Sequence, residues 1–224
     1  MPDADAIAPA LAGTRLANLD VGAAIGAGSR CTVHAARWRG VDRALKVYKP
    51  SAVAKHTRHN PLPLAEYEFS SNGEYRAAPA LAPYVAEPID FLVTPTLQLF
   101  VQERLRGPLY YFWYQRASAA ERERMHGHID RMVAEAHRAR IYGINLQALN
   151  VIVVSDARGE PLPKLFDFNR LPRHVHHSNR FLGLAVKLGL LTPERLDYMT
   201  LARFHDFRAL ERKIRQYGID EAAG

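Results

Sequence analysis

The spacing of apolar residues changes near Gly107, and this change limits the possible folds more than any other feature of the chain. Before Gly107, short alternating runs between turn residues predict strands, as at Cys31–Ala36 and Arg43–Tyr48. After it, apolar residues mostly recur every three or four positions, which is typical of helices with one buried face. A sheet-rich first half and a helix-rich second half predict an α+β protein.

Two further patterns in the first half predict regular structure. The run from Leu64 to Arg76 is expected to form a helix, because Pro63 suits the start of one. Ile89–Val93 and Leu97–Glu103 are expected to form two strands joined by the Thr94-Pro95-Thr96 turn.

Helices dominate the second half, with one pair of short strands among them. Ser118 and Glu121 match a capping box that opens a long helix. Val151–Val154 and Lys164–Phe168 are expected to be strands around a polar turn. Further helices are expected after Thr192-Pro193-Glu194 and between Phe204 and Tyr217. The long helix should bury one face, made of Met125, Ile129, Met132, Val133 and Ala136.

These patterns divide the chain into three expected parts. Residues 1–15 are rich in Ala, Pro and Asp and are expected to be a flexible N-terminal arm. Residues 16–106 would form a sheet lobe with one helix, and residues 107–224 a short helical lobe.

Composition narrows the partners that such a chain could bind. Its 224 residues are 48% hydrophobic, which suits one globular unit of two lobes. The net charge of +7 favours an anionic partner, such as a nucleotide, a phospholipid surface or an anionic saccharide. The basic residues are spread along the chain and no nucleic-acid motif is found, so nucleic acid is not the expected partner.

Three absences bear on the expected location. No stretch approaches twenty apolar residues, so no transmembrane helix is expected. The N-terminal segment lacks the basic cluster of a secretory signal. One cysteine, Cys31, cannot form an internal disulfide. We therefore expect a cytoplasmic protein, with a peripheral position at the inner face of the inner membrane as an option.

Four short motifs, in a fixed order, carry the functional prediction. The first lies where a strand at Ala24–Ile25 leads into Gly26 and Gly28, with Val33 further on. Glycines beside a strand let the backbone approach phosphates and offer N–H groups to them. Taken alone, this motif is explained equally well by an ordinary hairpin turn.

The second motif is Ala44-Leu45-Lys46, where a lysine stands inside an apolar strand pattern. An unpaired buried ammonium is costly, so Lys46 needs an acidic partner. Glu66 on the following helix is the first candidate and Glu68 the second, and the choice between them stays open. The alternatives are an edge-strand lysine that reaches solvent and glutamates that are simply solvated.

The third and fourth motifs lie around the two short strands of the second half. Asn145-Leu146-Gln147-Ala148-Leu149-Asn150 precedes the first strand, and Leu165-Phe166-Asp167-Phe168-Asn169 ends the second. The amide oxygen of Asn150 and the carboxylate of Asp167 are ligands that suit a hard cation such as Mg²⁺. A turn asparagine and a strand-capping aspartate are the alternatives. Four partial motifs in this order carry more weight than any one alone.

Together the motifs resemble the protein-kinase-like superfamily, over the range from Ala24 to Leu190. The third motif is similar to the D-L-N-A-H-N loop of bacterial lipopolysaccharide kinases, the Kdo and heptose kinases. The segment from Phe166 to Arg170 is similar to their I-D-F-D-x loop, and Asn179 to Leu184 resembles the helix that comes after it. The chain also resembles the small bacterial PhoP regulatory network protein family, and the sequence leaves both relatives open.

The resemblance implies a two-lobe fold that binds ATP and Mg²⁺. Lys46 would touch the α and β phosphates, and Asn150 and Asp167 would hold the metal. Glu103 would lie at the hinge between the lobes, where backbone groups meet adenine. The remaining expected nucleotide contacts are Gly26, Gly28, Val33 and the glutamate partner of Lys46, Glu66 or Glu68.

One departure from the kinase pattern bears directly on activity. Asn145 stands where the resemblance implies a catalytic aspartate, and an amide can orient a hydroxyl but cannot usefully accept its proton. The first expected function is a small phosphotransferase acting on a cell-envelope saccharide or a similar small acceptor. The alternative is a pseudokinase, a nucleotide-binding regulatory or scaffold module without turnover. The chain after Asp167 is also too short for a full activation segment and the usual helices.

Three other features have two interpretations each. His174, His176 and His177 are expected to be basic loop surface, with a metal or anion site as the alternative. The aromatic run Leu109–Tyr114 is expected to pack against the hinge, with a membrane or partner patch as the alternative. Cys31 is expected to be an unreactive small residue, unless a nearby lysine lowers its pKa.

Overall fold

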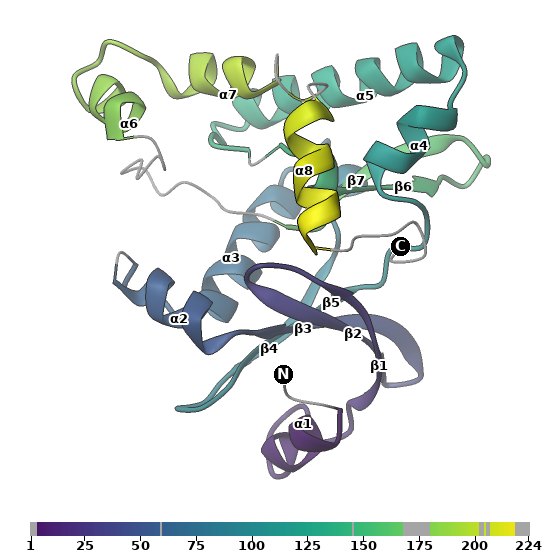
Figure 1. The fold of residues 1–224 in the computed structure, drawn as a ribbon, viewed down its shortest axis with the longest axis vertical. Coiled ribbons are helices and arrows are strands. Elements are labelled where there is room, and N and C mark those ends of the chain that lie inside the picture. The colour runs from purple at the N-terminus through teal and green to yellow at the C-terminus, as the bar shows by residue number, and fades with distance from the viewer. Residues whose placement is uncertain are drawn as a thin grey trace.

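The protein is described here by a computed structural model that covers residues 4–58, 60–144, 146–167, 180–201, 204 and 207–217. A five-stranded antiparallel sheet forms the lower part in Figure 1, in the order β1-β2-β3-β5-β4. The strands are β1 (Asp20–Ala27), β2 (Cys31–Trp38), β3 (Val41–Tyr48), β4 (Pro88–Val93) and β5 (Gln98–Glu103). The strands predicted in the first half are thus present, and the expected α+β class is confirmed.

Two helices lie between β3 and β4 in the chain. Helix α2 (Pro50–Thr57) leads to α3 (Leu64–Ala77), which matches the predicted helix and packs against β4 and β5. Leu64 and Ala65 of α3 are buried with Tyr48 and Phe100 of the sheet. This apolar contact fixes which face of α3 points at the sheet, and so which of its acidic residues can approach β3.

The prediction of a flexible arm is wrong for the part of residues 1–15 that the structure describes. Helix α1 (Ala4–Leu11) packs beside β1, at the bottom of Figure 1. Ile7, Leu11 and Leu16 are fully or almost fully buried and join a cluster with β2, β3 and β5. Ile7 and Leu11 are four positions apart and share one face of the helix, and burying that face offsets the cost of ordering the segment.

The other lobe is mainly helical. Its long helix α5 (Ala119–Arg138) begins with the predicted capping box of Ser118 and Glu121, and its five predicted apolar residues are all buried. The remaining elements are η1 (Ala82–Tyr84), α4 (Tyr110–Arg116), η2 (Ala148–Asn150), β6 (Val151–Ser155), β7 (Pro161–Leu165), α6 (Arg180–Lys187), α7 (Pro193–Leu201) and α8 (Phe207–Tyr217). Among the helices that the structure describes, none is both long and apolar enough to cross a membrane.

Strand β7 differs from its prediction. It runs over Pro161–Leu165 rather than Lys164–Phe168, and it pairs with β6 as a two-stranded hairpin. Prolines disfavour a central strand, but a two-stranded sheet leaves an edge where their missing N–H groups are tolerated. The carbonyl of Leu165 accepts a bond from the N–H of Ala86 (2.8 Å), so the strand ends there. Phe166 and Asp167 follow, and the carbonyl of Phe166 accepts from Lys46 of the larger sheet.

Gly107 lies where the chain passes from the sheet to the helical lobe. Its φ is +152°, and a Cβ there would stand 2.0 Å from the carbonyl oxygen of Val153. We expect Gly107→Ala to lower the free energy of unfolding by about 2–3 kcal/mol, as overpacking does. Gly127→Ala is the matched control: Gly127 lies in α5 with nothing near its added Cβ, so it should stabilise by roughly 0.5–1 kcal/mol. Urea unfolding measures both, and equal effects would contradict the close approach at Gly107.

Candidate nucleotide site

A buried ion pair joins the sheet to α3. Lys46 of β3 is 3% exposed, and its Nζ donates to Glu68 Oε2 at 3.1 Å and to the carbonyl oxygen of Phe166 at 2.7 Å. The rings of Phe100 and Phe166 lie 5.5 and 5.9 Å from the same ammonium. Burial alone would lower the pKa of Lys46, but the carboxylates of Glu68 and Asp167 outweigh it and hold that pKa above its usual value. Lys46 is therefore a fixed positive charge.

The partner of Lys46 is Glu68, so the preference for Glu66 is corrected. The two glutamates are two positions apart, which places them on nearly opposite sides of a helix. The buried face of α3 carries Glu68, while Glu66 is partly exposed in the first turn. Among the described residues, Glu66 has no contact with Lys46.

Two residues that the sequence did not single out complete the surroundings of Glu68. The hydroxyl of Tyr48 donates to Glu68 Oε2 at 2.6 Å, and Arg30 Nη2 lies 3.3 Å from Glu68 Oε1. Burial, and then the negative charge of Glu68, raise the pKa of Tyr48 well above its usual value. Both carboxylate oxygens thus face donors, which is what a buried charge requires.

Asp167 lies at the partly exposed side of this pair. Its Oδ1 is 3.9 Å from Lys46 Nζ and 4.0 Å from Arg30 Nη1, both too long for a hydrogen bond. This oxygen is buried and has no hydrogen-bond partner among the described residues. A carboxylate oxygen that faces two cations without a bond to either suits an added ligand, such as a metal ion.

Asn150 ends η2 beside this carboxylate. Its carbonyl oxygen accepts from the N–H of Phe166 at 3.2 Å, which brings the third and fourth motifs together. No group of three or more His, Cys, Asp or Glu side chains able to hold a metal occurs in the described ranges. The oxygens of Asn150 and Asp167 fit Mg²⁺, because proteins usually bind this ion through one or two side chains while phosphates and water fill the other positions.

The predicted glycine motif lies next to Lys46 in the sheet. Gly26 of β1 is opposite Val33 of β2, and Val33 is opposite Lys46 of β3. The turn after β1 is closed by the Gly28 N–H, which donates to the Cys31 carbonyl at 2.9 Å. The sheet register thus brings these predicted site residues into one row across three strands.

Cys31 comes directly after that turn. Burial raises the pKa of its thiol to about 12, although Lys46 and Arg30 act in the opposite direction. A thiol with so high a pKa is protonated at neutral pH, in agreement with the expectation of an unreactive residue.

Glu103 ends β5, where the chain leaves the sheet. Its side chain accepts from Lys164 Nζ at 2.6 Å and from the N–H of Glu87 at 3.1 Å. Its own N–H donates to the Glu87 carbonyl at 2.8 Å and is not available to a base. A backbone contact from Glu103 to adenine therefore remains a prediction, and it would have to use the carbonyl oxygen.

A second group missed in the sequence holds the loop that precedes Asn150. Both carboxylate oxygens of Asp197, in α7, accept from the N–H of Gly143, at 3.1 and 3.0 Å. His137 Nε2 of α5 lies 3.1 Å from Asp197 Oδ2. Burial raises the pKa of Asp197, while His137 and the Gly143 N–H act to lower it. No local pattern links Gly143 to an acid 54 positions later.

Several predicted residues lie outside the described ones: Asn145, Phe168, Asn169, Arg170, Asn179 and the cluster of His174, His176 and His177. The aromatic run Leu109–Tyr114 does lie within them. Tyr110 is buried, and its ring is 4.8 Å from that of Phe204. Tyr110 thus packs within the helical lobe, and packing of the run against the hinge stays a prediction.

Comparison with known proteins supports the fold. No family model and no curated protein matches the chain. Among solved structures, the crystal structure of Rad53 1-466 in complex with AMP-PNP is similar, with a TM-score of 0.52 and 16% sequence identity. The match covers 73% of this chain and 42% of that one, so the chain spans less than half the length of its structural neighbour. The chain has a protein-kinase-like fold, with a sheet lobe and a helical lobe.

Proposed function

We propose that this chain binds Mg-ATP at Lys46, Asp167 and Asn150. The observation that carries the proposal is the buried Oδ1 of Asp167, which has no hydrogen-bond partner among the described residues and lies 3.9 Å from a buried, charged lysine. At that distance the two groups form an ion pair but no hydrogen bond, so the buried oxygen still lacks a donor. The Rad53 structure with AMP-PNP supports a nucleotide as the ligand.

Each residue has a distinct task in this proposal. Lys46, fixed by Glu68, presents a positive charge to the phosphates. Asp167 and Asn150 offer oxygen ligands to Mg²⁺, which would neutralise phosphate charge and orient the phosphates. The Gly28 N–H is used within its own turn, where it donates to the Cys31 carbonyl, so a backbone contact to phosphate would have to come from other N–H groups of this turn.

We further propose that the chain transfers the terminal phosphate to a small, cell-envelope saccharide. The motifs shared with lipopolysaccharide kinases support this substrate class, and the net charge of +7 suits an anionic acceptor. Phosphoryl transfer depends mainly on positioning and charge, so the site could work without a strong base. Loss of the base at position 145 would cost on the order of 10²–10⁴ in rate.

The second candidate function is a pseudokinase, and the observation that favours it is Asn145 itself. An amide keeps the polar contact of an aspartate but cannot take the acceptor proton. Such a protein would bind nucleotide and act through its shape, without turnover.

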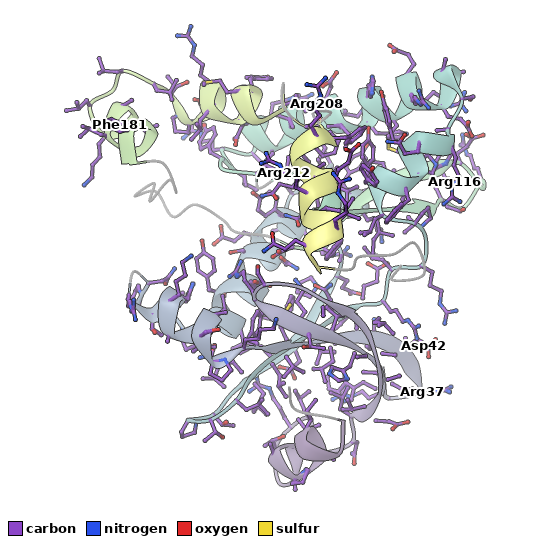
Figure 2. The ribbon with its side chains drawn as sticks, in the orientation of Figure 1. Arg37, Asp42, Arg116, Phe181, Arg208 and Arg212 are labelled. Atoms are coloured by element: carbon purple, nitrogen blue, oxygen red, sulfur yellow. The ribbon has the colours of Figure 1, made fainter. Side chains whose placement is uncertain are left out.

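The first test is a thermal-denaturation shift with Mg-ATP. At ligand concentrations about 100 times Kd, wild type should gain roughly 5–10 °C in Tm. Lys46→Ala and Asp167→Ala should lose this gain. Asp42→Ala is a matched control, since Asp42 lies at the start of β3 (Figure 2), where it pairs with Arg106 and both side chains are exposed. If the wild type shows no gain, the proposal fails.

Turnover is tested separately with Asn145→Asp. Clear gain of ATP hydrolysis or transfer in this variant would show a kinase site that lacks only its base. If wild type and variant both bind nucleotide and neither consumes it, the pseudokinase is the better description.

A further inference from the structure

Arg30 is a cation at the proposed site that lies within the first motif but was given no role by the sequence. It lies in the turn between β1 and β2, and its side chain is 28% exposed. Its guanidinium is 3.3 Å from Glu68 Oε1 and 4.0 Å from Asp167 Oδ1, so it spans the two carboxylates. Lys46 contacts the same two residues at 3.1 and 3.9 Å. Two cations therefore share two carboxylates in this structure.

The turn that carries Arg30 is anchored through its backbone. Lys49 N–H donates to the Arg30 carbonyl at 2.9 Å, and Lys49 Nζ donates to the Gly28 carbonyl at 2.6 Å. The main chain is thereby tied to the start of α2, while the guanidinium stays partly exposed. The side chain can change partners without a change in the turn.

Charge balance determines how the site responds when a divalent cation reaches Asp167. The cation would stand beside Arg30 and Lys46 with like charge, which is unfavourable without added anions. Phosphate oxygens would supply those anions. Lys46 is held by Glu68, Phe166 and its own burial, whereas the guanidinium of Arg30 is partly exposed and reaches Asp167 only at 4.0 Å.

We propose that Arg30 is a phosphate-binding residue, whose guanidinium exchanges Asp167 for the phosphate chain of the nucleotide. This inference rests on the proposed function and adds to it a residue that recognises the phosphates of the nucleotide rather than its adenine base. A guanidinium suits this role because its planar fork pairs with two phosphate oxygens at once. In the absence of nucleotide, the same group balances the charge of Glu68 and Asp167.

The experiment compares ligands that differ only in phosphate. Calorimetric titration with Mg-ATP, inorganic tripolyphosphate and adenosine is carried out on wild type, Arg30→Gln and Arg30→Lys. Arg37→Gln is the matched control, because Arg37 lies at the other end of β2, next to Asp42 (Figure 2). Melting temperatures without ligand establish that each variant is folded.

Arg30→Gln should weaken Mg-ATP and tripolyphosphate about 10- to 100-fold, the range for hydrogen bonds to charged groups, and leave adenosine unchanged. Arg30→Lys keeps the charge but loses the fork, so it should fall between wild type and Arg30→Gln. It also serves as the test if Arg30→Gln does not fold. Arg37→Gln should match wild type.

Two results would overturn the inference while the proposed function stands. Either Arg30→Gln binds Mg-ATP as tightly as wild type or tighter, or it loses adenosine and Mg-ATP equally. In both cases Arg30 would be a structural ion-pair partner only. If wild type binds no nucleotide at all, the proposed function itself fails, and the inference falls with it.

Discussion

Glu68→Gln is expected to lower the free energy of unfolding by about 3–5 kcal/mol, because it leaves the ammonium of Lys46 buried without its nearest anion. The hydroxyl of Tyr48 keeps an acceptor in the amide oxygen, so the loss reflects mainly the charge. Glu66→Gln is the matched control, since it changes the same group two positions away on a partly exposed face. That control should stay within about 0.5 kcal/mol of wild type.

The pH dependence of this loss has a definite sign. In wild type, Glu68 and Asp167 raise the pKa of Lys46, so the stabilisation is present below the pKa of an unfolded lysine and is lost at higher pH. In Glu68→Gln, burial then dominates and lowers the pKa of Lys46. A neutral lysine needs no anion, so the deficit should shrink as pH rises toward about 10. Urea unfolding between neutral and alkaline pH measures this, and equal losses in the two glutamine variants would contradict the assigned pair.

The sequence predicted the sheet side of the site well, because β strands have a simple register. Alternation around Lys46 predicted that it lies in a strand, and the observed register then places Gly26 and Val33 in the same row. The partner on α3 was harder to predict. The buried face of that helix includes Ser71 and Asn72 beside Leu64, so the apolar pattern did not show which face of the helix is buried. The choice between Glu66 and Glu68, on opposite sides of the helix, depends on knowing that face.

Long-range contacts set the other limit. The composition of residues 1–15 indicated a free arm, and only the sheet surface next to Ile7 and Leu11 explains why the segment folds. The end of β7 depends on the bond from Ala86 to Leu165, which lie far apart in the chain, and no local pattern contains it. Arg30 and Tyr48 were missed for the same reason. Their local sequence indicates only a turn and a strand, and their contacts with Glu68 are long-range.

Asp197 shows how such a long-range contact bears on function. Its buried carboxylate holds the N–H of Gly143, in the loop that ends with Asn150, and this loop also contains position 145. The contact connects α7 to the loop that carries Asn150, the proposed metal ligand. Among the described residues, the Gly143 N–H has no other acceptor. If the proposed function holds, Asp197 would act as a positioning residue, and its effect on nucleotide should pass through the metal.

We expect Asp197→Asn to cost about 2–3 kcal/mol of unfolding free energy, since it weakens a charged acceptor for a buried N–H and removes the anion beside His137. Affinity for Mg-ATP should fall about 10-fold or more, while affinity for ATP without Mg²⁺ should change little, because Lys46 lies outside the loop. Asp130→Asn, an exposed position on α5, is the control and should match wild type in both measurements. Calorimetric titration with and without Mg²⁺ separates the two effects. An equal loss for both ligands would mean that Asp197 supports the fold as a whole, and no loss for either would mean that it does not position a metal ligand.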